Sequence, residues 1–295
     1  PVGMVVGRLR GGWRGGRHEA LSLPKIAHST SILGMGDHID LTDGRVWYEE
    51  HGSGDPLILI HGGAVDSRFF EHNVPALAEQ FRVIAVDLWG HGRSPDREGP
   101  FSLDSFARDS AEIIERVAGG RAHVVGHSIG AGVALVLTVA RPELVDRLVM
   151  ISGGYDVRAD PPNPTPIEGM VEQTVAFLGS TYGEVSPDGE DHFPIVTRKD
   201  FELSAREPML TAQQVAAIGA RTLVVVADDD ISSLEHNLEM YRTIPNSELA
   251  VVPGTSHFLL QEKPALCNAI LLDFLGNDPV PTVAPVRRAP RGDSG

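Results

Sequence analysis

Gly126-His127-Ser128-Ile129-Gly130 follows an apolar, strand-like segment at 122–125 and opens a helical segment that runs to Arg141. A serine with a glycine two residues before and two residues after it is typical of a sharp strand-to-helix turn. The serine backbone in such a turn is strained and neighbouring chains crowd it, so the flanking positions need glycine. Such a turn exposes the Ser128 hydroxyl beside the positive end of a helix. The motif is also compatible with an inert turn, but its strand–turn–helix context favours a nucleophile.

Strand-like and helix-like segments alternate on both sides of this turn. The central strand candidates are near-continuous apolar runs, as expected for strands of a parallel sheet that is covered on both faces. The alternation predicts an α/β fold, a three-layer sandwich with a mostly parallel central sheet. The predicted strands are 37–42 and 46–50, which form an opening hairpin, then 57–60, 83–88, 122–125, 147–151, 222–227 and 248–252; the predicted helices are 69–80, 102–118, 128–141, one that Ser232 caps, and 264–275.

The segment 153–219 interrupts the alternation, because it contains no convincing strand. It begins with a proline-rich loop and continues with weak helical patterns at 167–178, 199–206 and 212–218. We expect a small helical cap over the carboxyl edge of the sheet, where open α/β folds bind ligands. The core domain is then 37–152 together with 220–276. Residues 1–36 are predicted to be a disordered extension, and 277–295 a flexible tail.

Charge and cysteine content exclude several classes of function. The chain of 295 residues has 25 Lys and Arg against 40 Asp and Glu, a net charge of −15. The two terminal segments carry +4 and +1, which leaves −20 on 37–276 and argues against nucleic-acid or membrane-surface partners. The single cysteine, Cys267, excludes an intrachain disulfide and is expected to be a buried apolar residue in a cytoplasmic protein. Oligomeric state has no signal in the sequence.

A second glycine-containing motif, His61-Gly62-Gly63, follows the predicted strand 57–60. Two small residues at this place allow a backbone N–H to approach a ligand oxygen. The Gly63 and Ile129 N–H groups are therefore predicted to form an oxyanion hole, with Ala64 as the alternative donor. His61 is expected to hold the loop rather than to take part in chemistry.

Acidic and histidine candidates follow two later strands. Asp228-Asp229-Asp230 comes after the strand 222–227, and His257 follows the strand 248–252. Three adjacent acids suggest a metal site, but no partner ligands have a recognisable spacing, so we predict no metal. We predict that Asp230 orients His257, and that Asp228 caps backbone N–H groups. Asp228, Asp229 and Asp156, which follows the strand 147–151, remain alternatives for the acid.

The order Ser128, Asp230, His257, together with the motifs above and the turn Asp87-Leu88-Trp89-Gly90-His91-Gly92-Arg93-Ser94, resembles the α/β-hydrolase fold superfamily. In that family the turn after the fourth strand is structural. A serine at position 128 argues against haloalkane dehalogenases and epoxide hydrolases, which mostly use aspartate. The chain looks most like the capped ester and lactone hydrolases of bacteria.

The resemblance implies cleavage of a small, neutral and apolar ester or lactone through an acyl-enzyme, without a cofactor or metal. The same triad also serves carbon–carbon bond hydrolysis, lyase and cofactor-free peroxidase chemistry, and similar scaffolds serve as ligand receptors. Six residues are predicted to line the substrate pocket: Ala64, Trp89, His127, Tyr155, Phe177 and Phe258.

Overall fold

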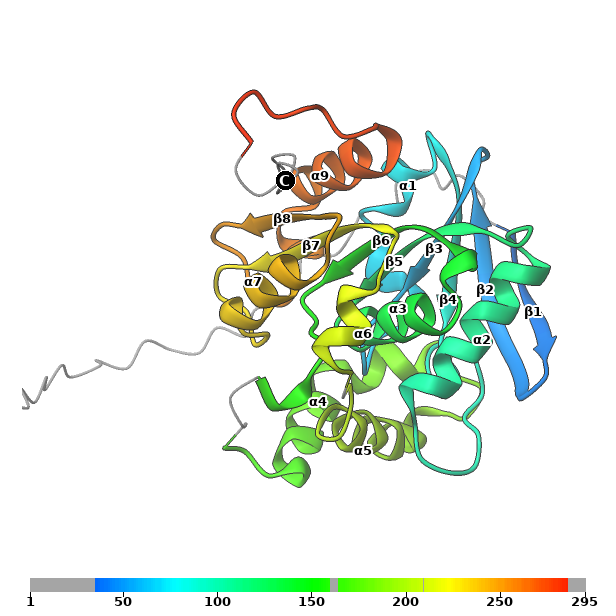
Figure 1. The fold of residues 1–295 in the computed structure, drawn as a ribbon. Helices are drawn as coiled ribbons and strands as arrows, with labels where there is room; N and C mark the ends of the chain where they lie inside the picture. The colour runs from blue at the N-terminus through cyan, green and yellow to red at the C-terminus, as the bar shows by residue number, and fades with distance from the viewer. Residues whose placement is uncertain (1–34, 160–163, 209, 286–295) are drawn as a thin grey trace, which may run out of the picture. The chain divides into compact units, whose positions relative to one another are not determined.

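The computed structural model describes residues 35–159, 164–208 and 210–285, which are built around an eight-stranded sheet (Figure 1). The strand order is β1-β2-β4-β3-β5-β6-β7-β8. The hairpin β1–β2 and the pair β2–β4 are antiparallel, and every other pairing is parallel, so the predicted sheet is confirmed. The strands are β1 Met35–Leu41, β2 Gly44–His51, β3 Asp55–Ile60, β4 Phe81–Asp87, β5 Ala122–His127, β6 Val145–Ile151, β7 Arg221–Ala227 and β8 Ser247–Val252.

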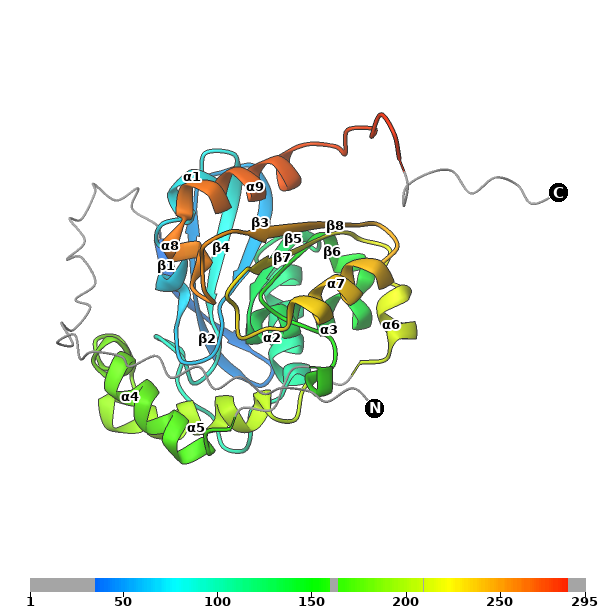
Figure 2. The same ribbon diagram turned by 90° about the vertical axis from the view of Figure 1, so that its left-hand side faces the viewer.

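Strand β3 shows why the central strands are almost entirely apolar. Leu57 and Leu59 belong to one core cluster, and Ile58 and Ile60 belong to another, because successive side chains point to opposite faces. All four side chains are fully buried. Figure 2 shows α1 and α9 on one face of the sheet and α2, α3 and α7 on the other, which makes three layers. These helices are α1 Val74–Leu77, α2 Leu103–Arg116, α3 Ile129–Ala140, α7 Leu234–Thr243 and α9 Pro264–Gly276, and the short α8 Leu259–Glu262 precedes α9.

The segment between β6 and β7, which is predicted to form the cap, contains α4 Ile167–Gly183, α5 Phe193–Ser204 and α6 Ala212–Ala216, and we call these three the cap helices. Helices α4 and α5 pack against each other at one end of the sheet (Figure 1). Arg68 pairs with Glu184 at 2.8 Å, and Lys199 pairs with Asp96 at 2.7 Å, so ion pairs join this part of the cap to the core.

Several predicted helix boundaries are wrong, among them the end of α4 at Gly183 instead of 178, and two of the errors involve proline. The expected helix 69–80 is instead a 3-10 turn, Ser67–Phe70, followed by the single-turn α1, because Pro75 cannot donate the hydrogen bond that would join them. Helix α5 begins at Phe193, six residues before the prediction, since Pro194 lies in its first turn, where no amide donor is needed. The cap of α7 is Ser233, not Ser232: its Oγ accepts from the His236 N–H at 3.2 Å.

At the N-terminal end the structure begins two residues before the predicted start of the core, because Met35 and Gly36 belong to β1. Most of the predicted extension, 1–34, and the last part of the predicted tail, 286–295, lie outside the described residues. Residues 277–285 form neither helix nor strand. Within the described ranges, no helix has the length and apolar character needed to cross a membrane.

Candidate active site

The turn between β5 and α3 holds Ser128 in a rare backbone conformation, with φ 56° and ψ −120°. Its own N–H donates to the Ile151 carbonyl at 2.9 Å, which ties the turn to the neighbouring strand. A Cβ on Gly126 would collide with the Gly130 carbonyl, and one on Gly130 would collide with the Ile60 carbonyl. The two glycines are therefore required by close backbone approach, as the sequence motif predicts.

Ser128, His257 and Asp230 form a continuous hydrogen-bonded chain. His257 Nε2 lies 3.0 Å from Ser128 Oγ, and His257 Nδ1 lies 2.7 Å from Asp230 Oδ1. Because a carboxylate only accepts, Nδ1 carries a proton and donates a hydrogen bond to Asp230, which leaves Nε2 free to accept the Ser128 proton. The residues come from the ends of β5, β7 and β8, so the structure brings together the three side chains that the sequence selects.

Asp230 is held as an anion by several donors, and its side chain is fully buried. Besides His257, it accepts hydrogen bonds from the Ser152 hydroxyl at 2.6 Å and from the Ser232 N–H at 3.1 Å. Burial alone would raise the pKa of Asp230, but the His257 contact and these two hydrogen bonds outweigh it and lower the pKa to about 2. The carboxylate is thus suited to orient His257 and to stabilise its imidazolium form.

Ser152 was missed by the sequence analysis, although it directly follows β6 and also lines the cavity described below. Its φ of 52° is unusual for a residue that has a Cβ. A serine followed by Gly153-Gly154 directly after a buried strand is the signal that could have identified it.

The alternative acids have other partners or are exposed. Asp228 Oδ1 accepts the Thr255 N–H at 3.1 Å, so it ties down backbone as expected. Asp229 is exposed, and Asp156 pairs with Arg158 at 2.6 Å. The three consecutive acids therefore do not converge, and no cluster of three or more potential metal ligands occurs in the described part of the chain.

His127 supports His257 from behind instead of lining a pocket. It is 3% exposed, its ring stacks on Phe69 at 4.5 Å, and its Nε2 donates to the His257 carbonyl at 2.9 Å. Burial, and then the neighbouring His257, lower the pKa of His127 to about 3. A neutral ring fixed in this way holds the backbone of the proposed base.

The loop His61–Ala64, which we call the oxyanion loop, packs directly on the serine turn. A Cβ on Gly62 would lie 3.0 Å from Ser128 Cβ, and one on Gly63 would lie 2.7 Å from Ile129 Cδ1. His61 Nδ1 donates to the Gly62 carbonyl at 2.6 Å, and its Nε2 accepts the Leu88 N–H at 2.9 Å. The loop-holding role expected of His61 is confirmed, and burial, followed by the nearby His91, lowers its pKa to about 4.

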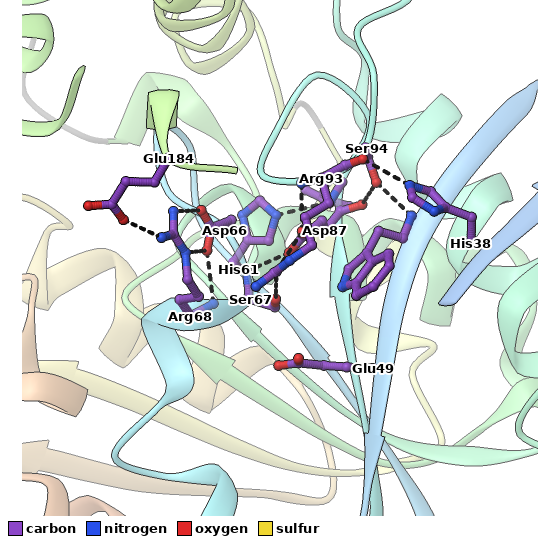
Figure 3. A network of polar contacts seen from close by, with 12 residues as sticks. His38, Glu49, His61, Asp66, Ser67, Arg68, Asp87, Arg93, Ser94 and Glu184 are labelled. Atoms are coloured by element: carbon purple, nitrogen blue, oxygen red, sulfur yellow. Dashed lines mark hydrogen bonds and ion pairs between the residues drawn. The ribbon is translucent and has the colours of Figure 1, made fainter. Parts of the chain in front are cut away.

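Asp87, at the end of β4, organises the turn that follows this strand (Figure 3). Its carboxylate accepts the Ser67 and Arg93 N–H groups, both at 2.8 Å. Its carbonyl accepts the Ser94 hydroxyl at 2.6 Å, and that hydroxyl in turn accepts the Trp47 N–H. The turn is thus a structural junction between β2, β4 and the segment that follows the oxyanion loop.

A cavity of about 170 Å³ lies beside Ser128 and His257, between the core and the cap. Among the described residues, those with acidic side chains in the lining are Asp156 and Glu207, and no lysine or arginine lines the cavity. Six apolar residues contribute to its wall: Leu103, Ile129, Val157, Leu203, Pro208 and Ile231.

None of the six residues predicted to line the pocket is among the residues that line this cavity. Tertiary packing decides which side of a helix or loop faces a cavity, and the local sequence does not show it. Trp89 is buried against Phe101, and the buried Tyr155 donates its hydroxyl to Glu239. Phe177 is 61% exposed on α4. Of the remaining three, Ala64 belongs to the oxyanion loop, His127 is the last residue of β5, and Phe258 precedes α8.

Comparison with known proteins identifies the class. Residues 55–196 match the family model described as alpha/beta hydrolase fold. With the sheet order and the serine turn above, this match places the chain in the α/β-hydrolase superfamily.

Among its relatives is the "Putative carbamate hydrolase RutD" of Azorhizobium caulinodans, 28% identical over 255 residues, which cover 79% of this chain and 96% of the relative. The 2-hydroxy-6-oxo-6-phenylhexa-2,4-dienoate hydrolase of Burkholderia cepacia is 26% identical, over 80% of this chain and 93% of the relative. The solved structure of a thermophilic esterase is 27% identical, with a TM-score of 0.68, over 83% and 98% of the two chains. The chain is thus similar to hydrolases that differ in their substrates.

Proposed function

We propose that the chain is a serine hydrolase that cleaves small, neutral carboxylic esters or lactones. The observation that carries the proposal is the hydrogen-bonded chain Ser128–His257–Asp230, whose serine opens into the cavity under the cap. The reaction needs no cofactor, and the cytoplasm is its proposed location.

In the proposed mechanism, neutral His257 accepts the Ser128 proton as the serine oxygen attacks the acyl carbon. The Gly63 and Ile129 N–H groups stabilise the negative oxygen of the tetrahedral intermediate; one such donor is typically worth about 3 kcal/mol. Collapse of the intermediate expels the alcohol, which takes the proton from His257. Water activated by the same histidine then releases the acyl group from Ser128.

The cavity supports a small and uncharged substrate. Its volume of about 170 Å³ is close to the roughly 150 Å³ of a cavity that accepts benzene, which favours short acyl groups. Asp156 and Glu207 line it, and their ion-pair partners Arg158 and Arg206 are not among the described lining residues, so a substrate carboxylate would meet acidic side chains there.

Carbon–carbon bond hydrolysis with the same triad is the second candidate, because one relative is named as a dienoate hydrolase. A dienoate is an anion, and the described residues that line the cavity include no lysine or arginine to bind it, which argues against this candidate. A direct comparison of p-nitrophenyl acetate, longer p-nitrophenyl esters, lactones and a dienoate substrate separates the two candidates. Turnover of the dienoate alone would overturn the ester proposal.

The test of the nucleophile is the Ser128→Ala variant, compared with Ser180→Ala, which removes an exposed serine of α4. We expect Ser128→Ala to abolish ester turnover and labelling by a fluorophosphonate, with an unchanged circular dichroism spectrum. Ser180→Ala should behave as the wild type. Labelling that persists in Ser128→Ala would refute the mechanism.

A further inference from the structure

Asp200 of the cap helix α5 lies directly behind the oxyanion loop. Its Oδ2 accepts the Ala64 N–H at 2.8 Å, across 136 positions of sequence. Its Cγ lies 3.0 Å from the place where a Cβ on Gly63 would stand, so the carboxyl group touches the loop at two successive residues. The side chain is only 5% exposed. A buried acid at this place requires a compensating partner.

His91 is that partner. Its Nε2 lies 3.0 Å from Asp200 Oδ2, and its Nδ1 lies 3.2 Å from the Trp89 carbonyl. Both ring nitrogens face acceptors, so the doubly protonated ring satisfies both contacts. Burial opposes this charge, but Asp200 outweighs it and raises the pKa of His91. The carboxylate is therefore fixed between His91 and Ala64.

The contact decides which N–H of the oxyanion loop is available. Ala64 N–H is already occupied by Asp200. The Gly63 N–H has no hydrogen-bond partner among the residues that the structure describes. Ala64 also has a φ of 60°, a conformation that costs energy for a residue with a Cβ, so an external contact is needed to maintain it.

We propose that Asp200 is a positioning residue, which holds Ala64 so that the preceding Gly63 N–H faces the developing oxyanion. The oxyanion hole then depends on a cap helix, and only a seated cap completes it. This inference rests on the proposed serine-hydrolase function.

The neighbouring Lys199 provides a matched control. It lies on the same helix and binds Asp96 of the core at 2.7 Å, but it forms no hydrogen bond or ion pair with the described residues of the oxyanion loop. Lys199→Met therefore weakens the attachment of the cap without removing the acceptor for Ala64. A general loosening of the cap would affect both variants, whereas loss of loop positioning affects Asp200→Ala alone.

The experiment measures the second-order rate constant for fluorophosphonate labelling of Ser128, with kcat and KM for p-nitrophenyl acetate. Asp200→Ala should lower the labelling rate and kcat about 10- to 100-fold with KM nearly unchanged, since the lost contact acts in the transition state. Asp200→Asn keeps an oxygen for Ala64 and should restore most of the rate. Lys199→Met should remain within about threefold of the wild type.

Wild-type labelling and kcat in Asp200→Ala would overturn the inference and leave the proposed function intact, as would an equal loss in Lys199→Met. A wild-type protein that is not labelled would overturn the proposed function and this inference with it. If Asp200→Ala does not fold by circular dichroism, Asp200→Leu, which fills the same space without an acceptor, is expected to show the same loss of kcat.

Discussion

Replacement of His127 by glutamine should flatten the acid side of the stability profile. In the folded chain, burial and the neighbouring His257 lower the pKa of His127 to about 3, whereas an unfolded histidine titrates near 6.5. Between these two values the unfolded chain binds a proton at this position and the folded chain does not. Acidification from pH 6.5 downward therefore favours unfolding, by up to about 1.4 kcal/mol per pH unit.

The size of the effect at pH 5 depends little on the folded value, provided that it lies well below 5. With a folded pKa of about 3 and an unfolded value of about 6.5, His127 costs about 2 kcal/mol at pH 5 and about 0.2 kcal/mol at pH 7. The wild type should thus lose about 2 kcal/mol more than His127→Gln between these pH values. His61, whose pKa burial lowers in the same way, is present in both proteins and cancels from the difference.

The assay is urea unfolding of both proteins at pH 5, 6, 7 and 8 and constant ionic strength, with the free energy of unfolding extrapolated to zero denaturant. A packing defect in His127→Gln would lower its free energy of unfolding equally at every pH. The difference between the pH slopes of the two proteins would therefore remain. Parallel pH profiles for the two proteins would show that His127 has the same pKa in the folded and unfolded chains, and would refute the reasoning.

Three further outcomes are expected. Asp230→Asn should lower kcat by about 10⁴-fold, as the equivalent change does in serine proteases, while Asp229→Asn, whose side chain is exposed, should change it little; equal losses would remove Asp230 from the triad. Cys267, whose pKa burial raises to about 11, should resist iodoacetamide at pH 8 until urea unfolds the chain, and rapid labelling of the native protein would contradict its buried position. Gly126→Ala should destabilise the fold by at least about 1–3 kcal/mol, because the added Cβ meets the Gly130 carbonyl, and an unchanged urea midpoint would refute this close approach.

The sheet and the triad geometry could be predicted because local sequence determines them. Ser128 and His257 each follow a short apolar strand, and the carboxyl ends of parallel strands meet at one edge, so their proximity follows from the strand pattern. Asp230 could be preferred over Asp228 and Asp229 because it lies furthest along the loop toward the next helix, although the cap of that helix is Ser233 and not the predicted Ser232.

The cap could not be predicted in the same detail. Phe177 looks like a pocket residue in the sequence, yet the packing of α4 leaves it exposed. Asp200 gives no local signal at all, because its partners Ala64 and His91 are more than 100 positions away. Contacts of this kind depend on how the cap is seated, which no periodicity encodes.

The insertion of the cap between β6 and β7 suggests that caps could be exchanged between related enzymes to change their substrates. The contact between Asp200 and Ala64 restricts that freedom, because a foreign cap would retain the triad and remove the acceptor that the oxyanion loop requires. A chimera would need a carboxylate or amide at the same place on its second cap helix. In the laboratory and during evolution, substrate range and turnover rate would then change together instead of independently.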